Sequence, residues 1–286
     1  MDLSIIIVSW NVKDNLRKNL EKIFQTKHKI NFELFVVDNN SDDGTVAMIK
    51  KDFSEVKLIE NDKNYGFARA NNQAIRNSKG RHILLLNPDM IIFEDTLNKT
   101  VDYMDANVKI GVVGCKLLNE KGEIVRHVRL FPTWRNQLAI ILKIPHIFSG
   151  VLKKYLRDDF DYNKDKEVAS IRGSFFVIRR GIINKIGELD ERFFVWFEEV
   201  DFCKRVWDSG ERVAYTPSIK CIDLVGRSFS RVNTLEKQKY FRNSMLEYFN
   251  KWHPGWQYLL LKAFWPLGIL LTKISIKLGS KSKAKT

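Results

Sequence analysis

The chain has 286 residues and a formal net charge of +14 at neutral pH. This length allows one large domain or two small ones, and no repeat or low-complexity stretch indicates a solenoid or a disordered chain. Its three cysteines, Cys115, Cys203 and Cys221, are an odd number without the spacing of a metal site. They exclude a disulfide framework and fit a reducing cytoplasm. Cys115 and Cys203 lie in apolar patterns that predict buried thiols.

The first predicted element is an apolar run from Leu3 to Asn11, which is typical of a strand buried on both faces. It lacks a basic start followed by a small-residue cleavage site, so we interpret it as a strand and not as a signal peptide. The stretch from Val12 to Phe24 follows, with Leu16 and Leu20 at helical spacing. A helix after the first strand is therefore expected.

The same alternation continues along the chain. A second apolar run, from Phe32 to Thr45, ends in a cluster of hydrogen-bond acceptors and small residues. A turn that leads into a helix is expected from Asn64 to Ile75, and a third strand from Gly80 to Leu86. Strands that alternate with helices over short connections favour an α/β fold, with a mostly parallel sheet and helices on its faces.

Polar residues follow each of these three strands. The strands end in VSWN, VVDNN and LLNPD, which places their polar side chains along one edge of the sheet. In open α/β sheets the ligand site lies beyond the carboxyl ends of the strands. A carboxylate such as Asp89 can hold a divalent cation there, and a cation suits a substrate that carries phosphates. Asn-Pro also begins ordinary turns, so the segment from Asn87 to Asp89 can be a turn alone.

These motifs, in this order and spacing, resemble the inverting family 2 glycosyltransferases with a GT-A (Rossmann-like) fold. The resemblance rests on VSWN, VVDNNSDDGT, NYGFARANN, LLLNPD, RGSFFVIRR and GELDERFFVWFEEVDFCKR and covers roughly residues 3 to 230. The Asn-Pro-Asp variant is similar to the rhamnosyltransferase-like branch, whose members often use dTDP-rhamnose and lipid-linked acceptors. The resemblance implies a GT-A domain over residues 1–250 and an enzyme that transfers a sugar from a nucleotide-sugar.

The resemblance assigns a nucleotide-binding role to residues near the first three motifs. Asp38 is expected to accept the imide N–H of uracil or thymine, and Ser9, Asn11 and Asn40 to line the same pocket. A helix cap or turn is the alternative for Asp38. Arg69, at the opening of a predicted helix, is a candidate phosphate ligand, with an ordinary surface arginine as the alternative.

The metal site departs from the family pattern. Asp89 takes the place of the last carboxylate in the Asp-x-Asp motif, and Asn87 stands where the first would be. Many relatives supply a histidine after the last core strand, whereas this chain has Asp223. A bridging Mg²⁺ or Mn²⁺ needs few protein ligands, because phosphate oxygens and waters complete its shell. We therefore expect Asp89, with or without Asp223, to hold the cation.

The acidic segment FEEVDFCKR is expected to supply the general base. Family members usually show Glu-Asp-x-Asp here, and Glu199 takes the position of the catalytic Asp. An apolar, aromatic setting would raise the pKa of Glu199 and suit it to accept a hydroxyl proton. The alternative is that these acids cap the helix from Val200 to Asp208. Gly173 is expected to allow close backbone approach to donor or acceptor, or to be an ordinary glycine at the start of a strand.

Two segments lie outside the family motifs. The stretch from Trp134 to Leu156 is apolar and basic without acids, and is either an acceptor-side excursion that touches a membrane or a helical cover over the sheet. Residues 251–286 form a basic amphipathic tail: from Tyr248 to Thr286 there are seven lysines and no acid. Its ten charge-free residues from Ala263 to Thr272 are fewer than the ~20 that span a bilayer.

At ~100° per residue, Lys262, Lys273 and Lys277 fall on one side of a helix, opposite apolar bulk. Such a helix suits an anionic membrane surface, with a helix packed on the catalytic domain as the alternative. Nucleic acid fits this apolar surface poorly. The expected protein is cytoplasmic and peripheral on the inner face of the cell membrane, and the sequence gives no oligomeric state.

The resulting hypothesis is a metal-dependent inverting hexosyltransferase that moves rhamnose from dTDP-rhamnose onto a lipid-linked or cell-surface polysaccharide acceptor. A UDP-hexose or UDP-N-acetylhexosamine donor is the alternative among enzymes, because thymine and uracil differ by one methyl group, worth only ~1–3 kcal/mol in an apolar pocket. The alternative of another class is a membrane-bound nucleotide-sugar binding protein without turnover. The changes at Asn87 and Asp223 motivate it, whereas the intact Asp38 and Asp89 argue against it.

Overall fold

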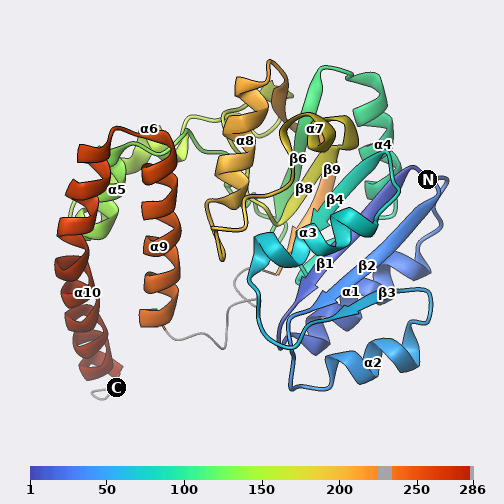
Figure 1. Ribbon diagram of the computed structural model, residues 1–286, viewed down its shortest axis with the longest axis horizontal. Helices are drawn as coiled ribbons and strands as arrows, with labels where there is room; N and C mark the ends of the chain where they lie inside the picture. Colours follow the sequence, from blue (N-terminus) through green and yellow to red (C-terminus); the bar gives the residue numbers. More distant parts are fainter. Residues whose placement is uncertain (225–233, 284–286) are drawn as a thin grey trace.

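The structure is a computed structural model that describes residues 1–224 and 234–283. The end of the family resemblance (residues 225–230) and of the basic tail (residues 284–286) lies outside the described residues. Figure 1 shows a central sheet with helices on both faces, and a group of helices that includes the C-terminal pair beside it.

Nine strands form one sheet within the described residues, in the order β3-β2-β1-β4-β8-β6-β9-β5, with β7 paired to β9. The strands are β1 (Leu3–Ser9), β2 (Phe32–Asp38), β3 (Lys57–Glu60), β4 (His82–Leu86), β5 (Met90–Ile92), β6 (Ile110–Leu118), β7 (Lys166–Glu167), β8 (Phe175–Arg179) and β9 (Arg212–Asp223). The helices are α1 (Lys13–Gln25), α2 (Thr45–Asp52), α3 (Phe67–Asn77), α4 (Thr96–Ala106), α5 (Trp134–Ile141), α6 (Lys153–Leu156), α7 (Arg180–Ile186), α8 (Glu198–Asp208), α9 (Thr234–Trp252) and α10 (Gly255–Lys283). Two 3₁₀ turns, Ile144–His146 and Ser149–Leu152, lie between α5 and α6.

The sheet is mixed and mostly parallel, which confirms the predicted α/β class. β3, β2, β1 and β4 are parallel to one another, and β6 is parallel to β9. β8 runs antiparallel between β4 and β6. Its first residue, Phe175, therefore pairs with Leu86 at the carboxyl end of β4. This antiparallel strand brings the segment before it, residues 170–174, to the edge at which the parallel strands end.

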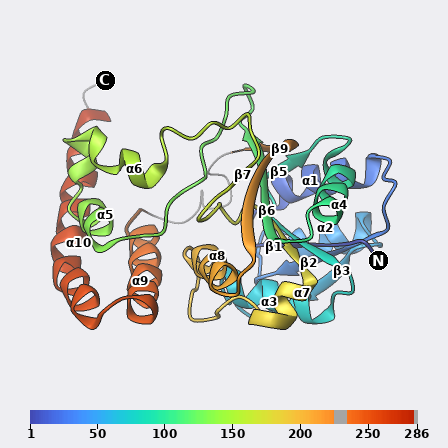
Figure 2. The same cartoon turned by 90° about the horizontal axis from the view of Figure 1, so that it is seen from above.

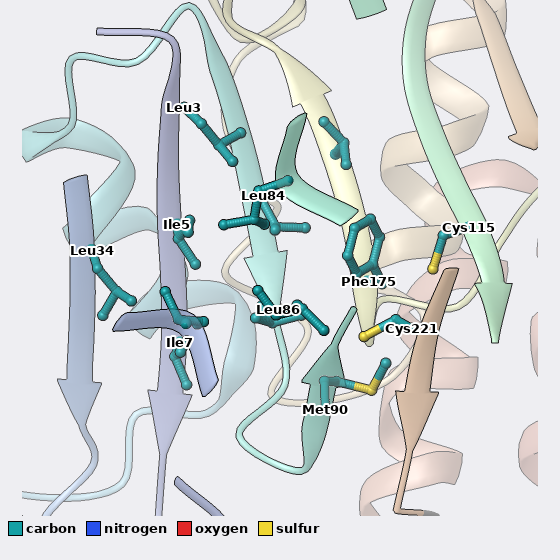
Figure 3. Close-up of a cluster of buried hydrophobic side chains, with 14 of the residues drawn as sticks. Leu3, Ile5, Ile7, Leu34, Leu84, Leu86, Met90, Cys115, Phe175 and Cys221 are labelled. Atoms are coloured by element: carbon teal, nitrogen blue, oxygen red, sulfur yellow. The ribbon is translucent and has the colours of Figure 1, made fainter. Parts of the chain in front are cut away.

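Strict alternation along the buried strands sends side chains into two cores. Ile5 and Ile7 of β1 pack with α1, α2 and α4 on one face, as Figure 3 shows for the strand side chains. Ile6 packs with α3, α7 and α8 on the other face. Because both faces are covered, the strands read as continuous apolar runs in the sequence. Cys115, Cys203 and Cys221 are free thiols within these cores, which confirms the predicted burial of Cys115 and Cys203.

A third apolar cluster joins α5, α9 and α10 to the loop before α8. It includes Ile141, Phe197, Tyr248, Phe249 and Leu261. Figures 1 and 2 both show α9 and α10 side by side, away from the sheet and with α5 next to α10. α5, the first helix of the segment from Trp134 to Leu156, thus packs against α10 and not against the sheet.

α10 contains one stretch, Gly255–Ser275, that is long and apolar enough to cross a membrane by length and composition, with a mean hydropathy of 1.3. This stretch is longer than the ten charge-free residues between Lys262 and Lys273, because it includes both lysines and the apolar residues beyond them. The inner side of α10 is packed: Leu261 and Thr272 are buried. A methyl group on Gly268 would lie 2.7 Å from the Ile141 side chain, so α10 crosses α5 closely there.

Candidate active site

A cavity of about 500 Å³ lies at the carboxyl edge of the sheet. Its floor comes from the ends of β1, β4 and β9, and one wall from the segment before β8. The opposite wall is aromatic and comes from the loop before α8 and from α9, with Phe194, Trp196, Tyr240 and Phe241. The predicted site residues that line this cavity are Asn87, Asp89, Gly173, Glu199 and Asp223.

The two predicted metal ligands are neighbours on the backbone. Asp223 ends β9 opposite Met90, and the amide of Leu224 donates to the carbonyl of Asp89 at 3.1 Å. Both carboxylates are buried, with 3% of Asp89 and 4% of Asp223 exposed. Arg172 donates through Nη1 to Asp223 Oδ2 at 3.1 Å. This part of the cavity therefore combines the two carboxylates with the guanidinium of Arg172.

These oxygen ligands suit a hard cation that keeps waters or phosphate oxygens in its shell. Within residues 1–224 and 234–283, no group of three or more His, Cys, Asp or Glu side chains is arranged to hold a metal. The residues present thus fit a cation bound mainly by substrate and by one or two carboxylates, and do not fit a cage built by the protein alone.

The acidic residues at the start of α8 have different surroundings. Asp201 is fully buried, and accepts hydrogen bonds from Arg205 Nε at 2.9 Å and from Trp252 Nε1 at 2.7 Å. Lys251 Nζ lies 2.7 Å from Asp201 Oδ1, the same oxygen that accepts from Trp252. Glu198 and Glu199, in contrast, both line the cavity, and their Oε2 atoms have no hydrogen-bond partner among the described residues. Asp201 therefore fixes the helix, while the glutamates face the space for a substrate.

Burial sets the protonation behaviour of this glutamate pair. Burial raises the pKa of Glu199, and backbone hydrogen bonds and the charges of Arg129 and Arg172 partly oppose that shift. Burial, followed by the negative charge of Glu199, raises the pKa of Glu198 well above its ordinary value. Glu198 therefore takes up a proton more readily than an ordinary glutamate, which leaves Glu199 as the better acceptor of a further proton.

The backbone before the glutamates is strained. Trp196 and Phe197 have φ of 66° and 68°, a left-handed conformation that is unusual for bulky side chains. A β-carbon built on Gly173 would lie 3.6 Å from Glu199 Cβ, so the main chain before β8 passes close to the base candidate. Gly66 has φ of 80° and leaves no room for a side chain next to Phe194, whose carbonyl accepts from the Phe67 amide at 2.6 Å. Together these contacts fix the loop that leads into α8, on which Glu199 lies.

Ser9 and Asp38 are neighbours at the ends of β1 and β2, where they pair in register. Both are buried, and Ser9 Oγ and Asp38 Oδ1 have no hydrogen-bond partner among the described residues. Asp38 Oδ2 accepts from the Ser41 amide at 2.8 Å. Burial raises the pKa of Asp38, and the hydrogen bonds from Ser41 act against that shift. Such unsatisfied buried polar atoms are the type of group that a ligand can complete.

The remaining predicted nucleotide residues lie elsewhere. Asn11 has φ of 55°, and its side-chain oxygen accepts from the Asp42 amide at 2.8 Å. Asn40 is exposed with φ of 64°. Arg69 is half exposed, 3.9 Å from Glu191 and over the ring of Tyr65. Like Ser9 and Asp38, these three side chains are not among those that line the cavity. The contacts of Arg69 within the described part of the chain are with Tyr65 and Glu191.

Other cavity residues were missed by the sequence analysis. They are Trp10, Asn39, His127, Arg129, Tyr155 and Arg172. Asn39 is buried, and its Nδ2 donates to the Gly66 carbonyl at 3.1 Å, which ties β2 to the start of α3. The only sequence signal for Arg172 was its place beside Gly173 in RGSFF. Arg129 and Tyr155 lie in none of the motifs: Tyr155 belongs to the segment from Trp134 to Leu156, and Arg129 lies shortly before that segment.

The family model "Glycosyl transferase family 2" matches residues 4–187. The chain belongs to glycosyl transferase family 2. This family membership agrees with the sheet topology, the carboxyl-edge cavity and the order of the motifs. It confirms the resemblance recognised in the sequence, including the rhamnosyltransferase-like character, which two curated relatives of the family share.

Curated family 2 relatives are distant and differ in length. The rhamnosyltransferase WbbL of Escherichia coli is 25% identical over 76% of this chain and 81% of its own length. The N-acetylglucosaminyl-diphospho-decaprenol L-rhamnosyltransferase of Mycobacterium tuberculosis is 21% identical over 89% of this chain and 86% of its own. The low-salt glycan biosynthesis hexosyltransferase Agl10 of Haloferax volcanii is 26% identical, and the match spans 61% of that protein's length.

Solved structures share the fold. The mannosyltransferase PcManGT from Pyrobaculum calidifontis, in complex with GDP-Man and Mn²⁺, matches 98% of this chain and 75% of its own with a TM-score of 0.59 and 16% identity. The S. aureus TarS 1-349 structure in complex with UDP matches 93% of this chain and 70% of its own, with a TM-score of 0.57 and 16% identity. The chain thus has the GT-A fold of a family 2 glycosyltransferase.

Proposed function

We propose that this glycosyltransferase is inverting and metal-assisted, and that it moves L-rhamnose from dTDP-rhamnose onto a lipid-linked or cell-surface polysaccharide acceptor. The observation that carries the proposal is the arrangement of carboxylates in one cavity. Asp89 stands at the end of the parallel strands, and Glu199 faces the same space from α8 with an unsatisfied oxygen. Transfer with inversion needs both a site for the leaving diphosphate and a base for the acceptor hydroxyl.

Glu199 is the proposed general base. Its pKa is raised by burial, which brings its basicity closer to that needed at neutral pH. Asp201 is unsuited to this role, because its carboxylate is enclosed by Arg205, Lys251 and Trp252. Gly173 has no side chain, and a β-carbon there would lie 3.6 Å from Glu199 Cβ, so the glycine leaves room for the acceptor hydroxyl next to the base.

Asp89 is the proposed ligand of Mg²⁺ or Mn²⁺, with Asp223 as a second candidate. A cation bound there supplies positive charge for the diphosphate leaving group. Asn87 adds a neutral polar side chain to the same turn, and Arg172 adds a permanent cation beside Asp223. Ser9 and Asp38 are proposed to bind the base, since both offer unsatisfied buried oxygens at the ends of β1 and β2. Asn11, Asn40 and Arg69 receive no such support.

The donor and acceptor are inferred from relatives. Two curated relatives that the chain covers over more than four-fifths of their length are named rhamnosyltransferases, one of them acting on a diphospho-decaprenol-linked sugar. This supports dTDP-rhamnose and a lipid-linked acceptor for this chain. A UDP-sugar donor remains the alternative, and one TarS structure is in complex with UDP-GlcNAc.

The C-terminal segment is proposed to rest on an anionic membrane surface on the cytoplasmic side. Five large apolar side chains of α10 are exposed by 42–62%: Trp256, Leu259, Leu267, Leu270 and Ile274. At 100° per residue they share a stripe ~80° wide, and the exposed Lys262, Lys273 and Lys277 border it. The lysines thus lie along one edge of the exposed apolar stripe, and the rest of the apolar bulk packs on α5 and α9.

This surface favours lying in the membrane interface over crossing the bilayer. α9 lies along α10 and carries Lys237, Lys239, Glu247 and Lys251, so a membrane-crossing α10 would draw charged side chains into lipid. Charged side chains in the hydrocarbon region cost several kcal/mol each. An apolar stripe with lysines at its border instead matches the interface, where lysine meets anionic headgroups.

A donor panel tests the proposed function. The protein is incubated with dTDP-rhamnose, a UDP-hexose and UDP-N-acetylglucosamine, each with a polyprenyl-diphosphate-linked sugar, with Mg²⁺, Mn²⁺ or EDTA. We expect nucleoside diphosphate release that is fastest with dTDP-rhamnose and metal. Fastest release with a UDP-sugar would correct the donor. Donor binding without release from any donor would favour the non-catalytic alternative.

A further inference from the structure

Arg129 is a cation in the cavity that the proposed chemistry does not use. Among the described residues, the cavity is lined by two cationic side chains, Arg129 and Arg172. Arg172 is paired with Asp223, whereas the described residues place no carboxylate at ion-pair distance from Arg129. A partly buried guanidinium without a counter-charge carries a desolvation cost that a bound anion would offset.

The main chain holds Arg129 firmly at this position. Its amide donates to the Ser170 carbonyl at 3.1 Å, and the Ser170 amide donates back to the Arg129 carbonyl at 3.2 Å. This two-way bridge sets Arg129 beside the segment that carries Arg172 and Gly173. A β-carbon built on Gly173 would lie 3.6 Å from Glu199 Cβ, so Arg129 lies on the same side of the cavity as the proposed base, and its charge acts to lower the pKa of Glu199.

Tyr155 completes a polar group around this guanidinium. The Arg129 guanidinium lies 6.0 Å from the centre of the Tyr155 ring. Burial raises the pKa of the Tyr155 hydroxyl, and the positive charge of Arg129 acts against that shift. The Leu130 amide donates to the Tyr155 carbonyl at 3.1 Å, which joins α6 to the strand-like segment of Arg129. His127 adds a buried ring whose Nδ1 has no hydrogen-bond partner in the described part of the chain. Donors and an unsatisfied polar atom thus gather at one place.

The position of Arg129 and Tyr155 indicates that they contact the acceptor and not the donor. The donor diphosphate belongs at Asp89, Asp223 and Arg172, where the proposed function puts the metal. The acceptor hydroxyl must reach Glu199, and Arg129 lies on that side. The cavity continues along the aromatic side chains of Trp196, Tyr240 and Phe241, the last two from α9. An acceptor with a phosphate next to an apolar chain matches a guanidinium followed by an aromatic wall.

We infer that Arg129, assisted by Tyr155, binds a phosphate group of the acceptor, so that the acceptor is a sugar joined through phosphate or diphosphate to an apolar chain. The inference rests on the proposed function for the location of donor and base. It assigns a specificity role to Arg129, which precedes α5, and to Tyr155 of α6, neither of which lies in a family motif. Recognition here is electrostatic and hydrogen-bonded, and no covalent step involves Arg129.

A binding experiment tests this assignment without turnover. Farnesyl diphosphate is titrated by calorimetry onto protein already saturated with dTDP and Mg²⁺, so that the donor site is occupied. A charged hydrogen bond is worth ~1.5–3 kcal/mol, so Arg129→Gln should weaken binding by roughly 10–100-fold, with partial recovery in Arg129→Lys. Arg126→Gln is the matched control, because Arg126 is exposed three residues away and pairs with Asp158. Farnesol binding should be equal in all four proteins.

A kinetic arm separates this inference from the proposed function. Transfer is measured to a sugar-diphospho-polyprenol and to the octyl glycoside of the same sugar. Arg129→Gln should raise KM about 10–100-fold for the first acceptor and leave KM for the second unchanged. An equal rise in KM for both acceptors in Arg129→Gln, or unaltered binding of farnesyl diphosphate, would overturn the role of Arg129. Absence of transfer by the wild-type protein from every donor, with Arg129-dependent diphosphate binding intact, would instead overturn the proposed function.

Discussion

Arg172 donates to Asp223 at 3.1 Å, and this ion pair lies next to Asp89 on the backbone. The position at which family members often carry a histidine therefore holds a carboxylate already engaged by a cation of the same protein. Arg172 competes with a metal ion for Asp223. The relationship makes Asp89 the stronger candidate for the cation.

Asp89→Asn should lower turnover at least ~100-fold, because a metal ion contributes several kcal/mol to stabilising the leaving group. We expect Asp223→Asn to raise the half-saturating concentration of Mg²⁺ less than Asp89→Asn does. Both constants come from rates of nucleoside diphosphate release across a metal titration. Full activity of the wild-type protein in EDTA would contradict a metal role for either residue.

Asp201→Asn should act on stability. The Asp201 carboxylate is fully buried and joins Arg205 on α8 to Lys251 and Trp252 on α9. Breaking one partner of a buried ion pair typically costs about 3–5 kcal/mol. Urea unfolding should show this loss, while the protein that remains folded turns over donor at nearly the wild-type rate. A folded but inactive Asp201→Asn protein would indicate that Asp201, and not Glu199, is the general base.

The fold could be predicted because its signals are local. The buried runs of β1, β2 and β4 alternate with α1 and α3, and each element lies within a few residues of its predicted position. The antiparallel insertion of β8 carried no such signal, because antiparallel pairing is decided by which strand is available at the edge of β4. The family resemblance covered this region without revealing the direction of the strand.

The site was predicted only in part, for a similar reason. Asp89, Asp223 and Glu199 lie in motifs at the ends of strands or helices, and the fold brings them to one cavity. Arg69 has the right residue type at the start of α3, yet its side chain lies against Tyr65 and toward Glu191 on the surface. Arg129 was missed because its place in the cavity depends on its main-chain pairing with Ser170, a contact between segments far apart in the sequence that no local pattern records.

His127 makes stability depend on pH. Burial lowers its pKa to about 3, with smaller contributions from Arg172 and Arg129. In the unfolded chain His127 is protonated below pH ~6.5, whereas in the folded protein it stays neutral until the pH approaches 3. This contribution to the free energy of unfolding is therefore complete above pH ~6.5 and is lost as the pH falls toward 3. His127→Gln should flatten the curve by up to ~1.4 kcal/mol per pH unit in this window. The free energy of unfolding is measured by urea unfolding at several pH values between about 6.5 and 4. The same pH dependence in the wild type and in His127→Gln would contradict this account.

Membrane association should depend on the outer side of α10 alone. Because Leu261 on the inner side is buried, single substitutions test the surface better than deletion of the helix. Leu270→Ser should weaken binding to anionic vesicles with a change in stability within ~0.5 kcal/mol. Lys273→Gln should cost about 1 kcal/mol of binding at low salt, while Lys18→Gln on the exposed side of α1 should cost nothing.

Salt separates an interfacial helix from one that crosses the bilayer. The attraction between lysine and anionic lipid is screened at high ionic strength. Washing membranes with concentrated salt should therefore release a large share of the protein. Protein that stays with the membrane after salt and alkaline carbonate washes would indicate that Gly255–Ser275 crosses the bilayer, against the interfacial arrangement.

The central claim is that Glu199 accepts the acceptor proton in an inverting transfer, and the turnover of Glu199→Gln tests it most directly. We expect kcat to fall roughly 10²–10⁴-fold with donor affinity nearly unchanged. The matched variant Glu198→Gln should stay close to the wild type, because the raised pKa of Glu198 favours its protonated form, which glutamine resembles. The wild-type product should carry the anomeric configuration opposite to that of the donor. Normal turnover by a folded Glu199→Gln protein, or a product with retained configuration, would contradict the account.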